Sequence, residues 1–164
     1  MEIRFYHPIG KYGCFSNFSE HPLSIDNKIW PTAEHYFQAQ KFSLTSPEHA
    51  EKIRLVVSPT DALRLGRERT YPIRHDWEEI KDDVMRLAVA VKFSSHSDLE
   101  QKLLSTGDAH IIEAAPHDFY WGEGNGSGKN MLGKILMEVR SALRTENIPN
   151  YKDTLGKLTG NSGL

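Results

Sequence analysis

The stretch between Ala33 and Phe42 constrains the fold of this chain more than any other segment. At 100° per residue of a helix, its apolar side chains lie all round the axis, at Ala33, Tyr36, Phe37, Ala39 and Phe42. A helix that is apolar on every side is usually buried. The segment therefore predicts a helix inside a hydrophobic core.

Three polar residues follow one side of the same predicted helix. Glu34, Gln38 and Lys41 have the i, i+4, i+7 spacing of a single helix face. A carboxylate in a core is costly unless it is paired, hydrogen-bonded or facing a cleft. Glu34 is therefore a candidate functional carboxylate. The alternative is an ordinary first-turn acid that the helix dipole favours and that points to water.

Local patterns predict an α+β fold that is mainly helical, with a small β-sheet. Helices are expected over 32–42, from 46, over 58–66, from 76 to beyond 91, over 97–104 and over 130–143. Strands are expected over 2–6 and 109–114, and Asp26-Asn27 indicates a hairpin turn between 23–25 and 28–30. We expect one compact domain over 1–146 and a polar tail over 147–164 that frays or forms a short element.

Composition narrows the class of protein. The chain has 164 residues, a net charge of −2 and a single cysteine, Cys14. One cysteine excludes an internal disulfide framework, and the sequence lacks both a membrane-length apolar run and a signal-peptide core. We therefore expect a cytoplasmic protein with no membrane contact. Balanced charge argues against a broad nucleic-acid footprint, so a bound anion should be small and held locally.

A glycine-rich segment over 120–130 is the second candidate for chemistry. It has four glycines in seven positions and leads into the last core helix, so its backbone amides can approach an anion closely. It is not a Walker A loop, because Glu123 stands at the first glycine position and Asn130 at the Ser/Thr position. A flexible connection and a phosphate cradle both remain open. Lys129 favours the cradle, since a bound anion would offset a cation at a helix start.

Arginines and histidines give weaker signals. Arg67, Arg69 and Arg74 fall beside predicted helix ends, where they either clamp a phosphate bidentately or are solvated loop charges. The eight histidines form no H-E-x-x-H or other ligand pair. No metal and no cofactor is expected.

Four segments, Gly13–Phe18, Trp30–Phe42, Arg74–Trp77 and Asp118–Gly122, occur in an order that resembles the NADAR family, also called YbiA-like N-glycosidases. The likeness covers about residues 4 to 144. It implies a compact, mostly helical α+β domain that cleaves N-glycosidic bonds without a metal or cofactor. The substrates that it implies are phosphoribosylamino-pyrimidine intermediates of riboflavin synthesis, or ADP-ribose attached to a nucleobase, notably guanine in nucleic acid.

The resemblance also implies roles for particular residues. The catalytic positions fall on Glu34, Trp77 and Asp118. The residues expected to bind the substrate are Ser16, Asn17, Lys41, Arg67, Trp121, Gly122 and Lys129. Cleavage of a ribosyl C1′–N bond passes through an oxocarbenium-like state, which needs carboxylates to stabilise the sugar, activate water or assist the leaving base. Which of Glu34 and Asp118 does which stays open.

Two alternatives accompany this interpretation. Trp77 either stacks on the base or is simply the first core residue of the helix that begins at Asp76. The whole chain is either an N-glycosyl hydrolase or a non-catalytic module that binds ADP-ribose or a related nucleotide. The pair of carboxylates favours the hydrolase, because acids near a phosphate weaken binding by repulsion. The hydrolase further requires Glu34 and Asp118 to converge on one sugar carbon.

Overall fold

The computed structural model describes residues 1–149 and 152–160. It divides into two compact units, of which the first contains Met1–Ser19 and Val89–Pro149. The second contains Glu20–Ala88 and the described part of the C-terminal segment. The expectation of one domain over 1–146 stays a prediction, and residues 150–151 and 161–164 of the predicted tail lie outside the described residues.

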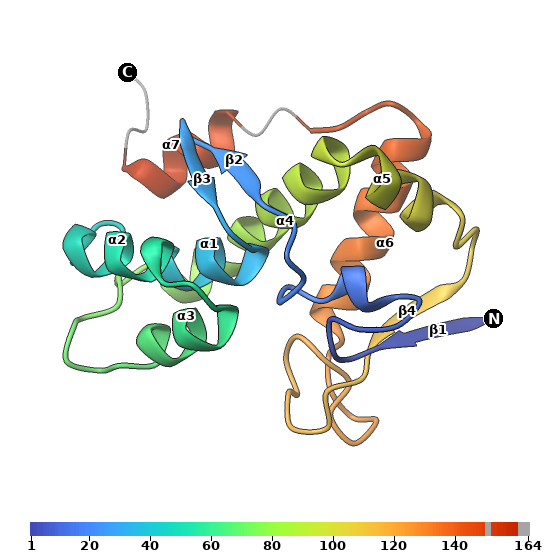
Figure 1. Ribbon diagram of the computed structural model, residues 1–164, viewed down its shortest axis with the longest axis horizontal. Helices are drawn as coiled ribbons and strands as arrows, with labels where there is room; N and C mark the ends of the chain where they lie inside the picture. Colours follow the sequence, from blue (N-terminus) through green and yellow to red (C-terminus); the bar gives the residue numbers. More distant parts are fainter. Residues whose placement is uncertain (150–151, 161–164) are drawn as a thin grey trace. The chain divides into compact units, whose positions relative to one another are not determined.

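The described residues form a mainly helical α+β structure, which confirms the predicted fold class (Figure 1). In chain order the elements are β1 (Glu2–Phe5), the 3-10 helix η1 (Gly13–Phe15), β2 (Leu23–Ile25), β3 (Lys28–Trp30), α1 (Ala33–Gln40), α2 (Pro47–Leu55), α3 (Pro59–Gly66), α4 (Trp77–Ser95), α5 (Ser97–Leu104), β4 (His110–Glu113), α6 (Met131–Arg144) and α7 (Lys152–Thr159). Each expected helix and strand is present within a few residues of its predicted bounds. The helix α7 is the short element expected in the tail.

The second unit is built around α1. All eight residues of α1 are buried, and the helix packs against α2 and α3 (Figure 1). Its start is set by Thr32, whose hydroxyl accepts a hydrogen bond from the His35 backbone N–H at 3.2 Å. The His35 ring lies between the Thr32 hydroxyl and the Val56 carbonyl, and burial lowers the pKa of this imidazole. The prediction of a buried helix is confirmed.

The hairpin of the second unit has the two-residue turn that the sequence predicts. Strands β2 and β3 pair antiparallel, with Ile25 opposite Lys28. The two residues between them, Asp26 and Asn27, have φ of 55° and 59°. A two-residue turn with both φ values positive matches the twist of the strands, and Asp and Asn are among the residues that tolerate it.

The first unit contains the other strand pair. Strand β1 pairs in parallel with β4, with Ile3 opposite Ile111, and α6 packs against β4. The single small sheet expected from the sequence is therefore wrong in one respect, because the described strands form two separate pairs. Strand partners far apart along the chain, such as β1 and β4, are decided by tertiary packing, which local patterns do not report.

Asn130 joins β4 to the start of α6. Its side-chain oxygen accepts from the Glu113 N–H, and its amide donates to the Ile111 carbonyl, each at 2.9 Å. Asn130 has a φ of 51°, a left-handed conformation that Asn adopts more readily than most residues. A side chain at Gly133 would overlap the Asn130 amide, so the first turn of α6 needs a glycine there.

Replacing Asn130 by Ala should lower the free energy of unfolding by about 3 kcal/mol, because two buried backbone groups lose their partners and Ala disfavours a positive φ. The measurement is urea denaturation followed by circular dichroism. The exposed Asn147→Ala is the matched control and should change stability by less than about 0.5 kcal/mol. A loss below about 1 kcal/mol for Asn130→Ala would show that this junction contributes little.

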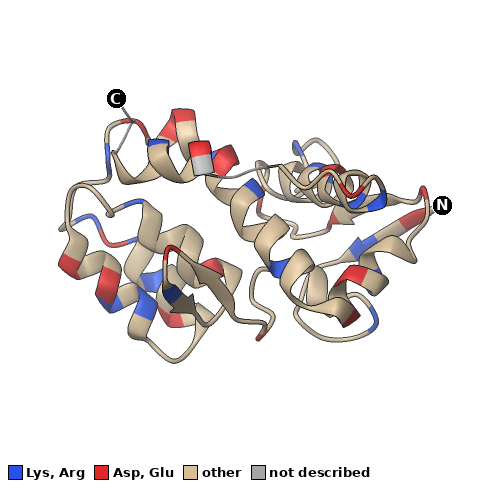
Figure 2. Cartoon of the chain, turned by 90° about the horizontal axis from the view of Figure 1, so that it is seen from above, with Lys and Arg blue, Asp and Glu red and all other residues tan. Residues whose placement is uncertain are grey.

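Basic and acidic residues are nearly equal in number, at 20 and 22, and they are mixed along the chain. Both kinds are interspersed along the helices (Figure 2). Several are paired at i, i+3, such as Arg54 with Glu51. Among the described residues, no helix combines the length and apolar character needed to span a membrane.

Candidate active site

Glu34 is buried in the second unit with a bonded side chain. It is 7% exposed, and its Oε1 accepts a hydrogen bond from Gln38 Nε2 at 2.8 Å. Gln38, one turn further along α1, is 3% exposed. The alternative of a first-turn acid pointing to water is therefore wrong. The amide N–H stabilises a negative charge on Glu34 and restricts the orientation of its carboxylate.

The Gln38 amide fits because α3 ends on a glycine. A Cβ at Gly66 would overlap Gln38 Oε1, so the amide lies directly against the Gly66 backbone. Gln38 Oε1 accepts no hydrogen bond within the described part of the chain. Since the donor end of the amide points at Glu34, its acceptor end must face Gly66. The absence of a side chain at residue 66 therefore lets Gln38 adopt the position from which it binds Glu34.

Lys41 brings a positive charge to the same region. Burial lowers its pKa to about 8, nearby Arg69 and Arg67 act in the same direction, and Glu34 opposes them. Its Nζ lies 5.9 Å from the centre of the Phe37 ring. Arg67 is exposed, and Arg69 donates to the Gly66 carbonyl at 3.1 Å. One carboxylate and three cations therefore lie in the vicinity of the α1 polar face.

Trp77 starts α4 and packs on the α1 helix. Its ring centre lies 5.1 Å from that of Phe37, with an angle of 58° between the planes. The residue is largely buried. It is a core residue, and its ring belongs to the same cluster as Phe37 and Lys41.

Arg74 serves the structure rather than a ligand. It is buried, it binds both carboxylate oxygens of Asp76 at 2.6 and 2.9 Å, and it donates to the Ser43 hydroxyl and the Leu158 carbonyl. Both interpretations offered by the sequence, a phosphate clamp and a solvated loop charge, are wrong for this arginine. Its guanidinium ties the start of α4 to α7 and to the turn after α1.

Asp118, in the first unit, is anchored by backbone groups. Its Oδ1 accepts from the Tyr120 N–H at 3.1 Å and from the Trp121 N–H at 2.8 Å. The carboxylate therefore closes the turn that leads into the glycine-rich segment. Trp121 is half-buried and its ring packs edge-on against Tyr120, at 4.9 Å between centres.

Glu113 is a buried acid next to this turn that sequence analysis did not single out. Burial raises its pKa to about 7, the neighbouring Asp118 adds to the rise, and a hydrogen bond from the Ala115 N–H opposes it. A side chain at Gly122 would overlap Glu113 Oε2, which explains the glycine at this predicted binding position. The sequence feature that could have indicated Glu113 is its position as an acid directly after the apolar residues of the strand.

The glycine-rich segment is closed by its own backbone. Four of its N–H groups and the two that follow it donate to carbonyls within 119–123, which rules out a loose connection. They belong to Gly126, Gly128, Lys129, Asn130, Met131 and Leu132. These six groups are consequently occupied and do not form a phosphate cradle. Lys129 is exposed and its Nζ lies 5.1 Å from the centre of the Tyr120 ring.

Ser16 and Asn17 follow η1 in the first unit, and both are buried. The Ser16 hydroxyl accepts from the Phe18 N–H at 3.2 Å, and its carbonyl accepts from Lys92 Nζ at 2.9 Å. Lys92 was not singled out from the sequence either. It is enclosed by protein, and burial lowers its pKa to about 7.

The two units divide the expected site residues between them. Glu34, Lys41, Arg67 and Trp77 belong to the second unit. Those in the first unit are Ser16, Asn17, Asp118, Trp121, Gly122 and Lys129. The convergence of Glu34 and Asp118 on one sugar carbon joins residues of different units and stays a prediction. Among the described residues, no group of three or more His, Cys, Asp or Glu is arranged to hold a metal ion.

Comparison with known proteins identifies the family. The family model of the NADAR domain matches residues 4–144. The N-glycosidase YbiA of Shigella boydii is 49% identical over 145 residues, covering 88% of this chain and 89% of that protein. The NMR structure of the Escherichia coli protein YbiA has a TM-score of 0.81 at 47% identity, covering 92% of this chain and 90% of the other. A third relative, the chloroplastic riboflavin biosynthesis protein PYRR of Zea mays, is 42% identical over 86% of this chain, which matches 25% of that protein.

A buried, hydrogen-bonded carboxylate with a lysine near it suits glycosyl hydrolysis, and the comparisons give the class of enzyme. The chain belongs to the NADAR family. It is an enzyme of the N-glycosidase class. The resemblance found in the sequence is thereby confirmed.

Glu113 provides a pH test of the site architecture. The folded protein keeps a proton on this carboxyl up to about pH 7, whereas the unfolded chain loses it near pH 4.5. Because the folded state binds this proton more tightly, the free energy of unfolding falls as the pH rises from about 4.5 to 7. Above pH 7 the effect of Glu113 is constant. Glu113→Gln cannot ionise, so its stability relative to wild type should rise by roughly 3 kcal/mol at most across that range.

Urea denaturation at pH 5, 6, 7 and 8 measures the difference between Glu113→Gln and wild type. Comparing the two proteins cancels other titrating groups, including Lys92, whose lowered pKa acts in the opposite direction. The control is Glu48→Gln, at an exposed position of α2. Its difference in unfolding free energy from wild type should not change with pH. A flat difference for Glu113→Gln as well would mean that this carboxyl ionises normally.

Proposed function

We propose that the chain hydrolyses the C1′–N bond between a phosphoribose or ADP-ribose and a base nitrogen, with Glu34 as its principal carboxylate. The observation that carries this proposal is the buried Glu34, held by Gln38 Nε2 at 2.8 Å and accompanied by Lys41. A fixed negative charge in a poorly solvated setting stabilises an oxocarbenium-like sugar more strongly than it would in water. The same carboxylate can instead accept a proton from the attacking water.

Asp118 is the proposed second carboxylate. Because two backbone N–H groups bind its Oδ1, its orientation is set by the turn rather than by the substrate. It either orients the ribose hydroxyls or assists the departing base, and in both roles a preset orientation lowers the entropic cost. The proposal requires Asp118 and Glu34 to reach the same ribose.

Trp77 is proposed to form an aromatic wall for the base or the sugar. Its contact with Phe37 at 5.1 Å fixes one side of the ring. A rigid indole can both stack on a base and keep water from the reacting carbon. Because Trp77 is only 7% exposed, the proposed role uses the small part of the side chain that its neighbours leave uncovered.

The substrate proposed for the site is anionic. Lys41, Arg67 and Arg69 supply positive charge around a single carboxylate, an arrangement that favours a phosphate-bearing ligand. Names of relatives that refer to riboflavin biosynthesis favour a phosphoribosylamino-pyrimidine. ADP-ribosyl-guanine, free or in nucleic acid, is the second substrate to test. Ser16, Asn17, Trp121, Gly122 and Lys129 are proposed to complete the binding surface.

Glu34→Gln should lower kcat by about 10²-fold or more on either substrate, because the change removes the charge and keeps the size of the side chain. Release of the free base is followed by chromatography, with Glu48→Gln as a control that should retain activity. Intact folding is checked by circular dichroism. If Glu34→Gln turns over as fast as wild type, the proposed role of Glu34 is wrong. Binding of ADP-ribose without release by either protein would support a binding module instead.

Lys41 should make substrate binding depend on pH. Its charge is lost as the pH rises through about 8, so KM for the phosphorylated substrate should rise above that pH. Lys41→Met should raise KM about tenfold at pH 7, the worth of a hydrogen bond to a charged group, and should remove the pH dependence. Steady-state kinetics from pH 6.5 to 9 measure both, with the exposed Lys52→Met as control. An unchanged KM in Lys41→Met would place the phosphate elsewhere.

A further inference from the structure

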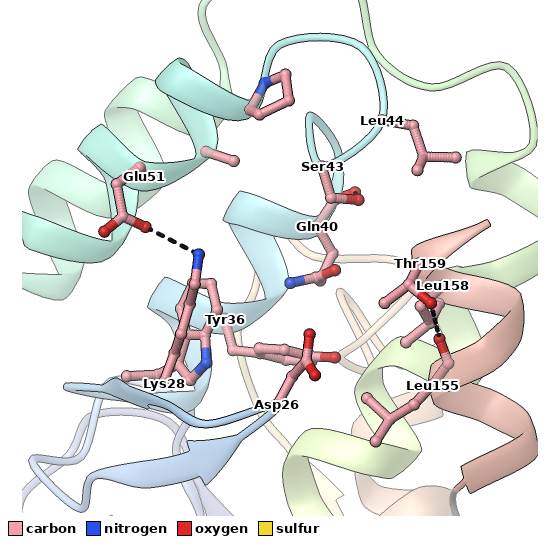
Figure 3. A pocket seen from close by; sticks show the side chains of 13 residues that line it. Asp26, Lys28, Tyr36, Gln40, Ser43, Leu44, Glu51, Leu155, Leu158 and Thr159 are labelled. Atoms are coloured by element: carbon pink, nitrogen blue, oxygen red, sulfur yellow. Dashed lines mark hydrogen bonds and ion pairs between the residues drawn. The ribbon is translucent and has the colours of Figure 1, made fainter. Parts of the chain in front are cut away.

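The second unit contains a cavity that no catalytic proposal uses. It has a volume of about 220 Å³ and lies among the β2–β3 hairpin, α1, α2 and α7 (Figure 3). Residues from each of these elements line it, among them Asp26, Lys28, Tyr36, Gln40, Glu51 and Leu155. We call it the hairpin cavity.

The hairpin cavity is on the opposite side of α1 from Glu34. Tyr36 and Gln40 follow Glu34 and Gln38 by two positions each, which is 200° around a helix. One side of α1 therefore presents Glu34 and Gln38, and the other presents Tyr36 and Gln40 to the cavity. A molecule in the hairpin cavity does not compete with a substrate at Glu34.

Two polar side chains of α1 face this cavity, Tyr36 and Gln40. Tyr36 is 2% exposed and Gln40 is 9% exposed. Within the described residues, neither the phenol of Tyr36 nor the side-chain amide of Gln40 makes a hydrogen bond. The phenol and the amide are therefore available to a polar ligand in the cavity, where a net hydrogen bond contributes about 1 kcal/mol. Burial raises the pKa of Tyr36 further above its ordinary value, so the phenol stays protonated and can donate.

The charges around the hairpin cavity balance, which favours an uncharged ligand. Asp26 is in no ion pair with any described residue, whereas Lys28 is already bound to Glu51 at 3.4 Å. Glu51 also pairs with Arg54, and these contacts lower the pKa of its carboxyl to about 2. Asp26 and Glu51 together balance Lys28 and Arg54, so the cavity has no net positive charge to attract a phosphate.

Size and shape limit the occupant further. The volume is below the about 300–1,000 Å³ of pockets that hold drug-sized ligands, so a whole nucleotide does not fit. The apolar part of the lining includes Trp30, Leu155 and Leu158, which suit a flat ring. An amide such as Gln40 matches the adjacent donor and acceptor of a base edge.

We propose that the hairpin cavity is a second binding site, for a free, uncharged heteroaromatic base, recognised by Gln40, Tyr36 and Asp26. Gln40 pairs with a donor and an acceptor on the base edge, Tyr36 donates to a further acceptor, and Asp26 accepts from an exocyclic amine. A base of this kind is what an N-glycosidase releases. The site therefore goes beyond the proposed function and does not depend on the role of Glu34.

The test is an NMR titration of the full-length chain with cytosine, monitored through backbone amides of 25–28 and 155–159. These segments border the hairpin cavity and are not in α1, so they separate this site from the Glu34 side. Cytosine should shift these amides and saturate. Ribose 5-phosphate and cytidine 5′-monophosphate should leave them unchanged, because one is anionic and the other is also too large.

Variants test the named contacts. Tyr36→Phe and Gln40→Leu each remove one polar group with little change of shape, and each should weaken cytosine binding about tenfold. Tyr6→Phe and Gln101→Leu, both exposed, are the matched controls and should bind as wild type does. Spectra without cytosine verify folding. The proposal is overturned if cytosine shifts neither segment, if the phosphates bind there equally well, or if both cavity variants keep the wild-type affinity.

Discussion

The hydrogen bond between Gln38 and Glu34 is the interaction on which the second unit depends for its chemistry. A carboxylate loses its hydration when it enters a core, and this desolvation costs free energy unless a fixed donor or a cation offsets it. Here the donor comes from the next turn of the same helix, and Lys41 follows one turn later. The end of α3 accommodates the arrangement by presenting Gly66, where any side chain would displace the Gln38 amide.

The first unit solves a related problem differently. Glu113 is also a buried carboxyl, but no cation opposes it among the influences on its pKa, and the group stays protonated to about pH 7. Hydrogen bonds hold the residue in place through its main chain and its carboxyl. Asn130 binds its N–H, the Ala115 N–H binds Oε1, and the Glu123 N–H binds its carbonyl. The loop that carries Asp118 therefore packs against a buried acid whose pKa is raised to about 7.

The two sides of α1 also differ in electrostatic character. On the Glu34 side, three cations accompany one carboxylate, which suits the phosphorylated substrate that we propose. On the Tyr36 side, two acids and two bases balance and the cavity is small, which suits an uncharged ring. A single helix thus separates two polar environments of different net charge. Ligands of different charge can occupy them at the same time.

The sequence by itself determined the elements and the identity of the family. Periodicity and capping residues report local geometry, so the helices, the Asp26-Asn27 turn and the burial of α1 could be predicted, and the Trp30–Phe42 motif pointed to the NADAR family. Tertiary structure alone decided that Arg74 is internal, that Glu113 is a buried acid and that Gln40 faces a cavity. The reason is physical: desolvation and hydrogen-bond partners depend on residues distant in the chain, such as Leu158 beside Arg74.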